Sequence, residues 1–373
     1  MSARAVLHYM HTWGGLTLGF LIVLLGLSGS ALVFRADIEQ WQMREWSRVQ
    51  PTDNRLSLDR IIAIGAAQIP QKEVVRVVLA HSPADSVEVV LQKRRPRNLK
   101  DADLVSVFVD PYRGTVLGQR ARASGWLWKL QDFHYALFAG DPGLKVNGIG
   151  AAILLLLAVS GPLLWWPGWR QRQYAFRIRA KPNNAMWRDL HALSGVVACI
   201  ALALISSTAL YYAYRTTATA AIALASGTSG VLPPSVRTNA GSPVIAGTDV
   251  LIAAARQAVP SALLDELRPS RGLHTAPAVV SFRMPGDAVI GRHRMFLDPA
   301  SAAVMRIDRY ETLPAGARLL ANMAPWHYGS FGGRLTQWLW FVAGLLPAGL
   351  FASGLWLWLR RRHGKPAMAT VSA

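Results

Sequence analysis

Four long runs without a charged residue limit the fold of this chain more than any other feature. They extend over about Trp13 to Phe34, Val146 to Trp166, Ala192 to Tyr214 and Leu335 to Leu359. Each run reaches the roughly 20 residues with which an apolar helix crosses a bilayer core. Of the 373 residues, 52% are hydrophobic and only 16% are charged, which is more apolar than a typical soluble domain. The sequence therefore predicts an integral membrane protein with four transmembrane helices.

The first run is long enough to be retained as a helix rather than removed as a signal peptide. Its uncharged core exceeds the roughly 7–15 residues of a signal-peptide apolar region. In addition, His11 near its start recurs as His191 at the start of the third run, and each histidine is followed four residues later by a glycine.

The charge distribution predicts the orientation. Net charge is +19, but six basic residues stand against Asp189 alone in the short segment 167–189, and Arg360, Arg361 and Arg362 follow the last run. Short basic segments mark the cytoplasmic side of a membrane. Both termini and 167–189 are therefore expected inside, with 35–145 and 215–334 outside, and no nucleic acid is expected as partner.

An internal duplication is visible in a repeated motif, H-Y-x-x-F-x-G, which begins at His134 and again at His327. From each histidine it is 26 residues to a Ser-Gly pair, Ser160-Gly161 in the first case and Ser353-Gly354 in the second. The spacing is the same in both copies, with no insertion or deletion between the histidine and the Ser-Gly pair. The chain is therefore predicted to consist of two related halves.

The two outside segments repeat the same order of elements, a helix followed by strands and an Asp-Pro turn. The expected helices are Leu56 to Ile69 and Asp249 to Val259, and the expected strands include Val74–Leu79, Val87–Leu91, Val105–Val109 and Val279–Arg283. The turns at Asp110 and Asp298 are each expected to lead into another strand, from Phe108 to Val116 and from Phe296 to Val304. Each outside segment is therefore expected to form a small α+β domain.

These motifs together resemble the PepSY-associated transmembrane helix family, and within it the ferrioxamine-type ferric-siderophore reductases. The resemblance covers nearly the whole chain. It implies a di-haem bacterial inner-membrane oxidoreductase that passes electrons to a ferric siderophore in the periplasm, where ferrous iron is released. An alternative is a membrane-tethered PepSY regulatory or binding module without redox activity.

The expected organisation follows from the runs and the resemblance: transmembrane helix 1 at 1–34, a first external PepSY-like domain at 35–125, an interfacial segment and helix 2 at 126–166, a basic cytoplasmic loop at 167–189, helix 3 at 190–214, a second external PepSY-like domain at 215–317, an interfacial segment and helix 4 at 318–359, and a cytoplasmic tail at 360–373.

Four histidines are the candidate cofactor ligands, and the topology divides them into two pairs. His11 and His191 begin helices that run outward, so both lie near the inner face, whereas His134 and His327 precede helices that run inward. Ionisable groups at membrane depth are costly and usually functional, and imidazole is a common axial ligand of haem iron. Two haems, each between two histidines, are therefore expected. They are expected to be of the non-covalent b type, because the chain has a single cysteine, Cys199, and cannot contain the C-x-x-C-H motif of haem attachment.

The depth of the small residues along the membrane helices predicts which of them lie beside each histidine pair. Ser28 follows His11 by 17 residues, or roughly 26 Å of helix rise, which places Ser28-Gly29 and the equivalent 206–208 beside the outer histidines. By the same reasoning the two Ser-Gly pairs of the inward helices lie beside the inner histidines. Small side chains there would leave room for a porphyrin.

Several alternatives remain. A histidine at a membrane interface can be a simple anchor, and His8 lies three residues before His11 on nearly the same helical face. Asp132 and Asp189 are candidate partners for ring N–H groups. The remaining histidines, His81, His274, His293 and His363, are expected to be solvated.

Further partners follow from what the sequence lacks. No G-x-G-x-x-G or P-loop motif occurs, so the electron donor is expected to be external, a cytoplasmic reductase or membrane quinol. No catalytic acid, base or nucleophile is assigned. Membrane lipid surrounds the helices, and the aromatic residues next to the outer histidines are the first candidates for a substrate surface: Trp126, Trp128, Tyr135, Trp326 and Tyr328.

Overall fold

A computed structural model describes residues 1–93, 103–166, 176–179, 184–227, 246–270, 276–287, 289 and 291–363. Most of the expected basic loop 167–189 and the tail 364–373 lie outside these residues. The chain divides into two compact units, one of residues 1–34, 130–220 and 323–373 and the other of residues 35–129 and 221–322. Each unit is described by itself.

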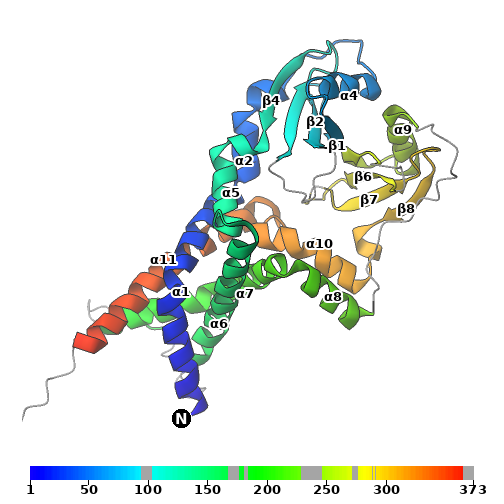
Figure 1. The fold of residues 1–373 in the computed structure, drawn as a ribbon. Helices are drawn as coiled ribbons and strands as arrows, with labels where there is room; N and C mark the ends of the chain where they lie inside the picture. The colour runs from blue at the N-terminus through cyan, green and yellow to red at the C-terminus, as the bar shows by residue number, and fades with distance from the viewer. Residues whose placement is uncertain are drawn as a thin grey trace, which may run out of the picture. The chain divides into compact units, whose positions relative to one another are not determined.

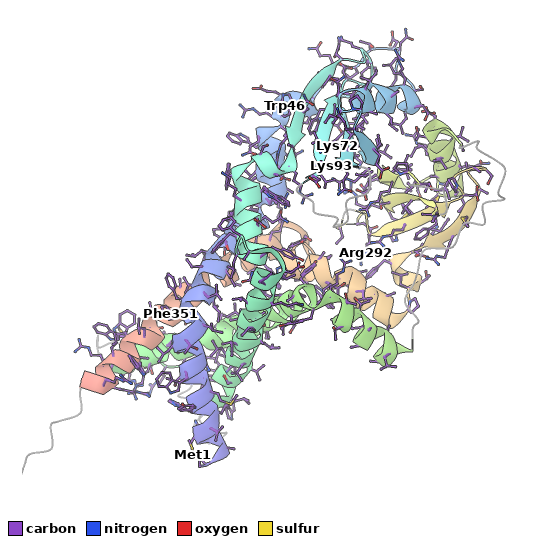
Figure 2. All side chains as sticks on the ribbon, viewed as in Figure 1. Met1, Trp46, Lys72, Lys93, Arg292 and Phe351 are labelled. Atoms are coloured by element: carbon purple, nitrogen blue, oxygen red, sulfur yellow. The ribbon has the colours of Figure 1, made fainter. Side chains whose placement is uncertain are left out.

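The first unit contains the predicted membrane helices. Among the described residues four helices are long and apolar enough to span a bilayer: α1 (Ala3–Val33), α6 (Gly140–Trp165), α7 (Asn184–Ala213) and α11 (Gly333–His363) (Figure 1). Each contains one of the four uncharged runs. The prediction of four transmembrane helices is therefore confirmed.

The four helices pack as a square. Helix α1 packs against α6 and α11, and α7 packs against the same two helices. Backbones come close where side chains are absent: a Cβ at Gly26 of α1 would lie only 2.4 Å from the Gly344 carbonyl oxygen of α11. In this arrangement α1 and α7 stand diagonally opposite, and so do α6 and α11.

Shorter helices connect the membrane helices to the second unit. Their bounds are α2 (Arg35–Gln42), α3 (Arg44–Ser47), α5 (Trp126–Ala136), α8 (Arg215–Ser226) and α10 (Ala315–Tyr328). Helices α5 and α10 directly precede α6 and α11, so they occupy equivalent places in the two halves.

The second unit is an eight-stranded antiparallel sheet with strand order β4-β3-β2-β1-β5-β6-β7-β8 (Figure 1). The first four strands are β1 (Lys72–Val78), β2 (Val87–Lys93), β3 (Val105–Val109) and β4 (Val116–Ala121). The others are β5 (Leu263–Arg268), β6 (Ala278–Arg283), β7 (His293–Leu297) and β8 (Val304–Asp308). Two helices, α4 (Leu58–Ala67) and α9 (Thr248–Ala258), contribute to its core.

The two external repeats are joined into one sheet and share one core. Strands β1 and β5 pair at the centre, with Val77 opposite Leu267 and Val78 opposite Glu266. One hydrophobic cluster contains buried residues of both halves. The α+β prediction is confirmed, and the two predicted domains form a single unit because their first strands pair with each other.

A reciprocal contact between α4 and α9 repeats the symmetry of the sheet. The carboxylate of Asp249 accepts backbone N–H bonds from Leu58 at 2.8 Å and Asp59 at 3.0 Å, and the carboxylate of Asp59 accepts one from Thr248 at 2.7 Å. Each helix start therefore receives a side-chain cap from the other helix, which satisfies N–H groups that have no partner within their own helix.

The two predicted Asp-Pro turns have the same geometry. Asp110 Oδ1 accepts N–H bonds from Tyr112 at 2.8 Å and Arg113 at 3.1 Å, and Asp298 Oδ1 accepts them from the second and third residues after it at 2.9 Å. Burial opposes ionisation of Asp110, but these N–H bonds outweigh it and lower its pKa; N–H bonds, led by that of Ser301, also lower the pKa of Asp298. Both turns are therefore fixed by an ionised carboxylate.

Two expectations about the second unit were wrong. Strand β5 lies where no strand was predicted. His293, expected in solvent, is only 1% exposed: its Nε2 lies 2.8 Å from Asp287 Oδ2 and its Nδ1 accepts the Tyr310 N–H at 3.1 Å. His81 is partly exposed and lies 2.9 Å from Asp265, while His274 and the side chain of His363 are outside the described residues.

Candidate functional site: two histidine pairs in the helix bundle

The inner pair is formed by His11 of α1 and His191 of α7. Their ring centroids are 6.4 Å apart. The two helices stand diagonally opposite in the bundle, so the imidazoles meet across its centre. His8, the alternative to His11, is exposed, and the geometry brings His11 rather than His8 to His191.

The outer pair is formed by His134 of α5 and His327 of α10, whose ring centroids are 6.2 Å apart. Both histidines stand near the last turn of a short helix, just before the chain reverses into α6 or α11. The two pairs therefore join equivalent residues of the two halves, as predicted from the duplication.

The H-Y-x-x-F-x-G motif forms the reversal that places His134. Leu137, Phe138 and Gly140 all have positive φ, at 51°, 60° and 60°. Asn147 of α6 then donates to the carbonyl oxygens of His134 at 2.8 Å and Tyr135 at 2.9 Å. The carbonyls at the end of α5 are satisfied in this way, and the histidine is held by a turn rather than by a continuous helix.

The second copy of the motif reaches the same result with other side chains. Gly329 and Gly333 have φ values of 71° and 68°, a conformation that glycine adopts without steric cost. Thr336 Oγ1 donates to the Gly329 carbonyl at 2.6 Å, and Trp340 Nε1 donates to the Trp326 carbonyl at 2.7 Å.

Each of the four imidazoles is hydrogen-bonded through Nδ1 to a hydroxyl group on another helix. The pairs are His11 with Ser160 at 2.7 Å, His191 with Ser353 at 2.9 Å, His134 with Ser28 at 3.1 Å, and His327 with Thr208 at 2.9 Å. The predicted levels of the small residues are therefore confirmed. Their hydroxyl groups bind the rings, a role that the sequence interpretation did not give them.

The hydroxyl bonds also determine which ring nitrogen carries the proton. A hydroxyl has one proton to donate, and each of the four donates it to a carbonyl of its own helix; Ser353, for example, donates to Gly349 at 2.7 Å. With its own proton directed to that carbonyl, each hydroxyl is placed to accept from the Nδ1–H of its histidine. The Nε2 atom of each ring is left with a free lone pair, the form in which imidazole binds a metal.

Glycines beside the serines allow this close approach. A Cβ at Gly29 would lie 2.8 Å from Cε1 of His134, one at Gly354 would lie 3.3 Å from Cε1 of His191, and one at Gly161 would lie 3.5 Å from Cε1 of His11. The Ser-Gly pair thus supplies a hydrogen-bond acceptor and the space that the ring occupies.

The separation of the rings suits two axial ligands of one metal. With a metal–nitrogen distance of about 2 Å and roughly 1.1 Å from each nitrogen to its ring centre, two imidazoles on opposite sides of an ion have centroids about 6 Å apart. Both pairs match this spacing. Among the described residues no group of three or more His, Cys, Asp or Glu side chains is placed to hold a metal ion, so each pair suits a cofactor that supplies its own equatorial ligands, as haem does.

The predicted carboxylate partners of the histidines are not used. Asp189 is bound by Arg179, with Arg179 Nη2 2.6 Å and Nε 2.8 Å from its carboxylate. Asp132 was a candidate partner for His134, but His134 Nδ1 is hydrogen-bonded to Ser28 at 3.1 Å instead. Serine and threonine are the uncharged alternative, which costs less to place within a membrane bundle.

One residue beside the outer pair was missed by the sequence interpretation. The ring of Tyr212 lies 5.4 Å from that of His327 and stacks at 6.5 Å on Tyr328, which is 54% exposed. Tyr212 follows Thr208 by about one helical turn, so both side chains lie on the face of α7 that contacts His327. This spacing is the sequence signal that could have identified Tyr212. Tyr135 is also exposed, and exposed aromatic rings therefore flank the outer histidines.

Comparison with known families supports the interpretation of the fold. A family model described as PepSY-associated TM region matches residues 8–361, which includes all four membrane helices, both histidine pairs and the external sheet. The comparison with curated proteins found no match. The chain belongs to the PepSY-associated transmembrane family.

Proposed function

We propose that this protein is a di-haem b oxidoreductase of the bacterial inner membrane that reduces a ferric siderophore in the periplasm. The observation that supports it is the pair of facing imidazoles at each end of the bundle, 6.4 and 6.2 Å apart, with every Nδ1 bound to a hydroxyl. Haem bound there would supply one-electron transfer from one side of the membrane to the other.

The chain's own residues have distinct roles in this proposal. His11 and His191 hold the inner cofactor through Nε2, and His134 and His327 hold the outer one. The hydroxyl that accepts from each Nδ1–H keeps the ring in one orientation and makes its Nε2 a better donor to a metal.

The remaining parts of the bundle exclude competing chemistry. The helix segments between the two pairs are uncharged and apolar, and such a core disfavours the passage of water and free ions between the sites. At the outer pair, the aromatic rings of Tyr212 and Tyr328 pack against His327.

The substrate, direction and donor come from the resemblance and the charge pattern. Within the family, the likeness is to the ferrioxamine-type siderophore reductase FoxB, and this likeness suggests a ferric siderophore as the substrate. Reduction of a ferric chelate by one electron requires no general acid, base or nucleophile from the chain, and ferrous iron, being held more weakly, then leaves. The electrons enter on the cytoplasmic side from a reductase or from membrane quinol.

The test is to reduce the purified protein without oxygen, add a ferric hydroxamate siderophore and follow haem reoxidation by stopped flow. Reoxidation is expected in the wild type and a large loss of rate in His327→Ala. Reoxidation by no ferric chelate would reject the reductase proposal. An unimpaired His327→Ala variant would place the exit of electrons elsewhere. A purified protein without haem would instead support the regulatory module.

A further inference from the structure

A basic cavity of about 150 Å³ lies in the first half of the external sheet. Helix α2, strands β1, β2, β3 and β4 and the residues next to them line this cavity. Its charged side chains are Arg35, Arg76, Arg120, Arg122, Glu39 and Glu88. Four arginines against two glutamates leave a net charge of +2 in a partly buried space.

The pairing of these side chains leaves positive charge directed at the cavity. Glu39 Oε1 accepts from Arg35 Nη2 at 3.0 Å and from Arg120 Nη2 at 2.9 Å, so one carboxylate serves two guanidinium groups. Both arginine side chains are less than one-fifth exposed. Glu88 Oε1 accepts the hydroxyl proton of Ser106 at 2.5 Å.

Arg76 is the side chain most in need of a further acceptor. Its Nε is buried and has no hydrogen-bond partner among the described residues. Its nearest carboxylate is Glu266 Oε2, 3.7 Å from Nη1, and that carboxylate is already held by Arg268 at 2.7 Å. A buried donor without an acceptor destabilises the folded protein, the more so when the group is charged, and a bound anion would supply the missing acceptor.

The second half of the sheet provides an internal comparison, because the strand registers identify equivalent positions. Arg76 of β1 lies opposite Val90 of β2, and Glu266 of β5 lies opposite Ser281 of β6. Because β1 and β5 are the first strands of the two repeats, Glu266 is the equivalent of Arg76. Likewise Arg120 lies opposite Ser106 as Asp308 lies opposite Arg294, so Asp308 is the equivalent of Arg120.

Two cavity arginines thus correspond to carboxylates in the other repeat. There Asp308 is paired with Arg306 at 2.7 Å, and Glu266 is paired with Arg268 at 2.7 Å. The two repeats therefore share one fold but carry opposite charges at these two equivalent positions. Packing alone does not require this reversal, since the equivalent face folds with carboxylates.

We propose that this cavity binds a single phosphate or carboxylate group. The volume holds several waters, each of which needs roughly 10–15 Å³ by the same measure, but it is smaller than the roughly 300 Å³ of a pocket for a drug-sized ligand. Guanidinium groups bind oxyanions through paired N–H donors. The oxyanion can be free in solution or part of a lipid headgroup, because Arg35 is only two residues beyond Val33, the end of the membrane helix α1.

The test uses the full-length protein in neutral detergent, with inorganic phosphate as the probe at constant ionic strength and calorimetry as the readout. Arg76→Gln is expected to weaken phosphate binding at least tenfold, while Arg294→Gln, on the equivalent face of the second repeat, leaves it unchanged. Thermal unfolding of both variants checks that the fold is retained.

A second arm distinguishes the source of the oxyanion. The protein is placed in nanodiscs of phosphatidylglycerol or of phosphatidylcholine, and retained lipid is measured by native mass spectrometry after release. No response to free phosphate, but retention of phosphatidylglycerol that is lost in Arg76→Gln, would support the cavity as a headgroup site. Equal behaviour of wild type, Arg76→Gln and Arg294→Gln in both arms would overturn the proposal.

Discussion

Removing the hydroxyl of Thr208 while keeping its shape should loosen the outer cofactor site. Valine has nearly the same volume as threonine, so Thr208→Val leaves no cavity and removes only the group that accepts from His327 Nδ1 at 2.9 Å. Thr208 is 1% exposed, and water therefore cannot replace the lost acceptor. The variant isolates one hydrogen bond of the site.

The size of the effect follows from the neighbours of the ring. A buried N–H left without an acceptor costs about 1–3 kcal/mol, and loss of a partner behind a metal-binding histidine typically costs 10- to 100-fold in affinity. The ring of Tyr212, 5.4 Å from that of His327, still packs against the imidazole in the variant and helps to orient it. We therefore expect a loss near the lower end, roughly tenfold.

The assay is haem transfer from the purified protein to excess apomyoglobin, followed by absorbance. Thr208→Val should release one of its two haems about ten times faster than the wild type. Ser207→Ala is the matched control, because Ser207 is exposed and its hydroxyl donates only to the Ala203 carbonyl at 2.7 Å. Equal transfer rates for Thr208→Val and Ser207→Ala would refute the role given to the hydroxyl.

Three other outcomes are expected. Gly29→Leu should lose the outer haem and keep the inner one, because even a Cβ there would lie 2.8 Å from Cε1 of His134; retention of two haems would contradict this steric argument. The pKa of Asp110 and that of Asp298 are lowered in the folded state. The two ionised carboxylates therefore stabilise the fold fully above the unfolded pKa of about 3.9, and this stabilisation is lost as pH falls through the lower folded pKa values. The melting temperature should fall below about pH 4, less steeply in Asp110→Asn, and an unchanged slope in that variant would count against the role given to the turn. A periplasm-dependent reporter fused after Gly227 should be active, and activity of a cytoplasm-dependent reporter at that site would reverse the proposed orientation.

The parts of the fold that could be predicted from sequence are those with a strong local pattern. The membrane helices follow from uncharged runs, and β2, β3 and β6 follow from alternating or continuous apolar residues. Strand β5 was missed because its sequence, Leu-Leu-Asp-Glu-Leu-Arg, carries charges at consecutive positions. Asp265 is nevertheless 2% exposed, since Arg283, His81 and the Gly291 N–H all bind it, and these partners come from distant segments.

The site shows the same division between local and distant information. The motif spacing predicted which histidines pair and at which level the serines lie, because helix rise converts residue number directly into depth. It did not predict the hydroxyl bonds to Nδ1, since these depend on the rotation of each helix about its axis. The basic cavity combines four arginines from one helix, two strands and a following turn, and sequence spacing alone does not bring these together.

The pyridine haemochrome spectrum of the purified protein, taken with its protein concentration, gives the number of haems that the two histidine pairs hold. We expect two b-type haems per chain, one in His11→Ala, one in His134→Ala and none in the double variant, since each pair would hold its cofactor independently. A wild-type protein without haem, or single variants that keep both, would contradict this expectation.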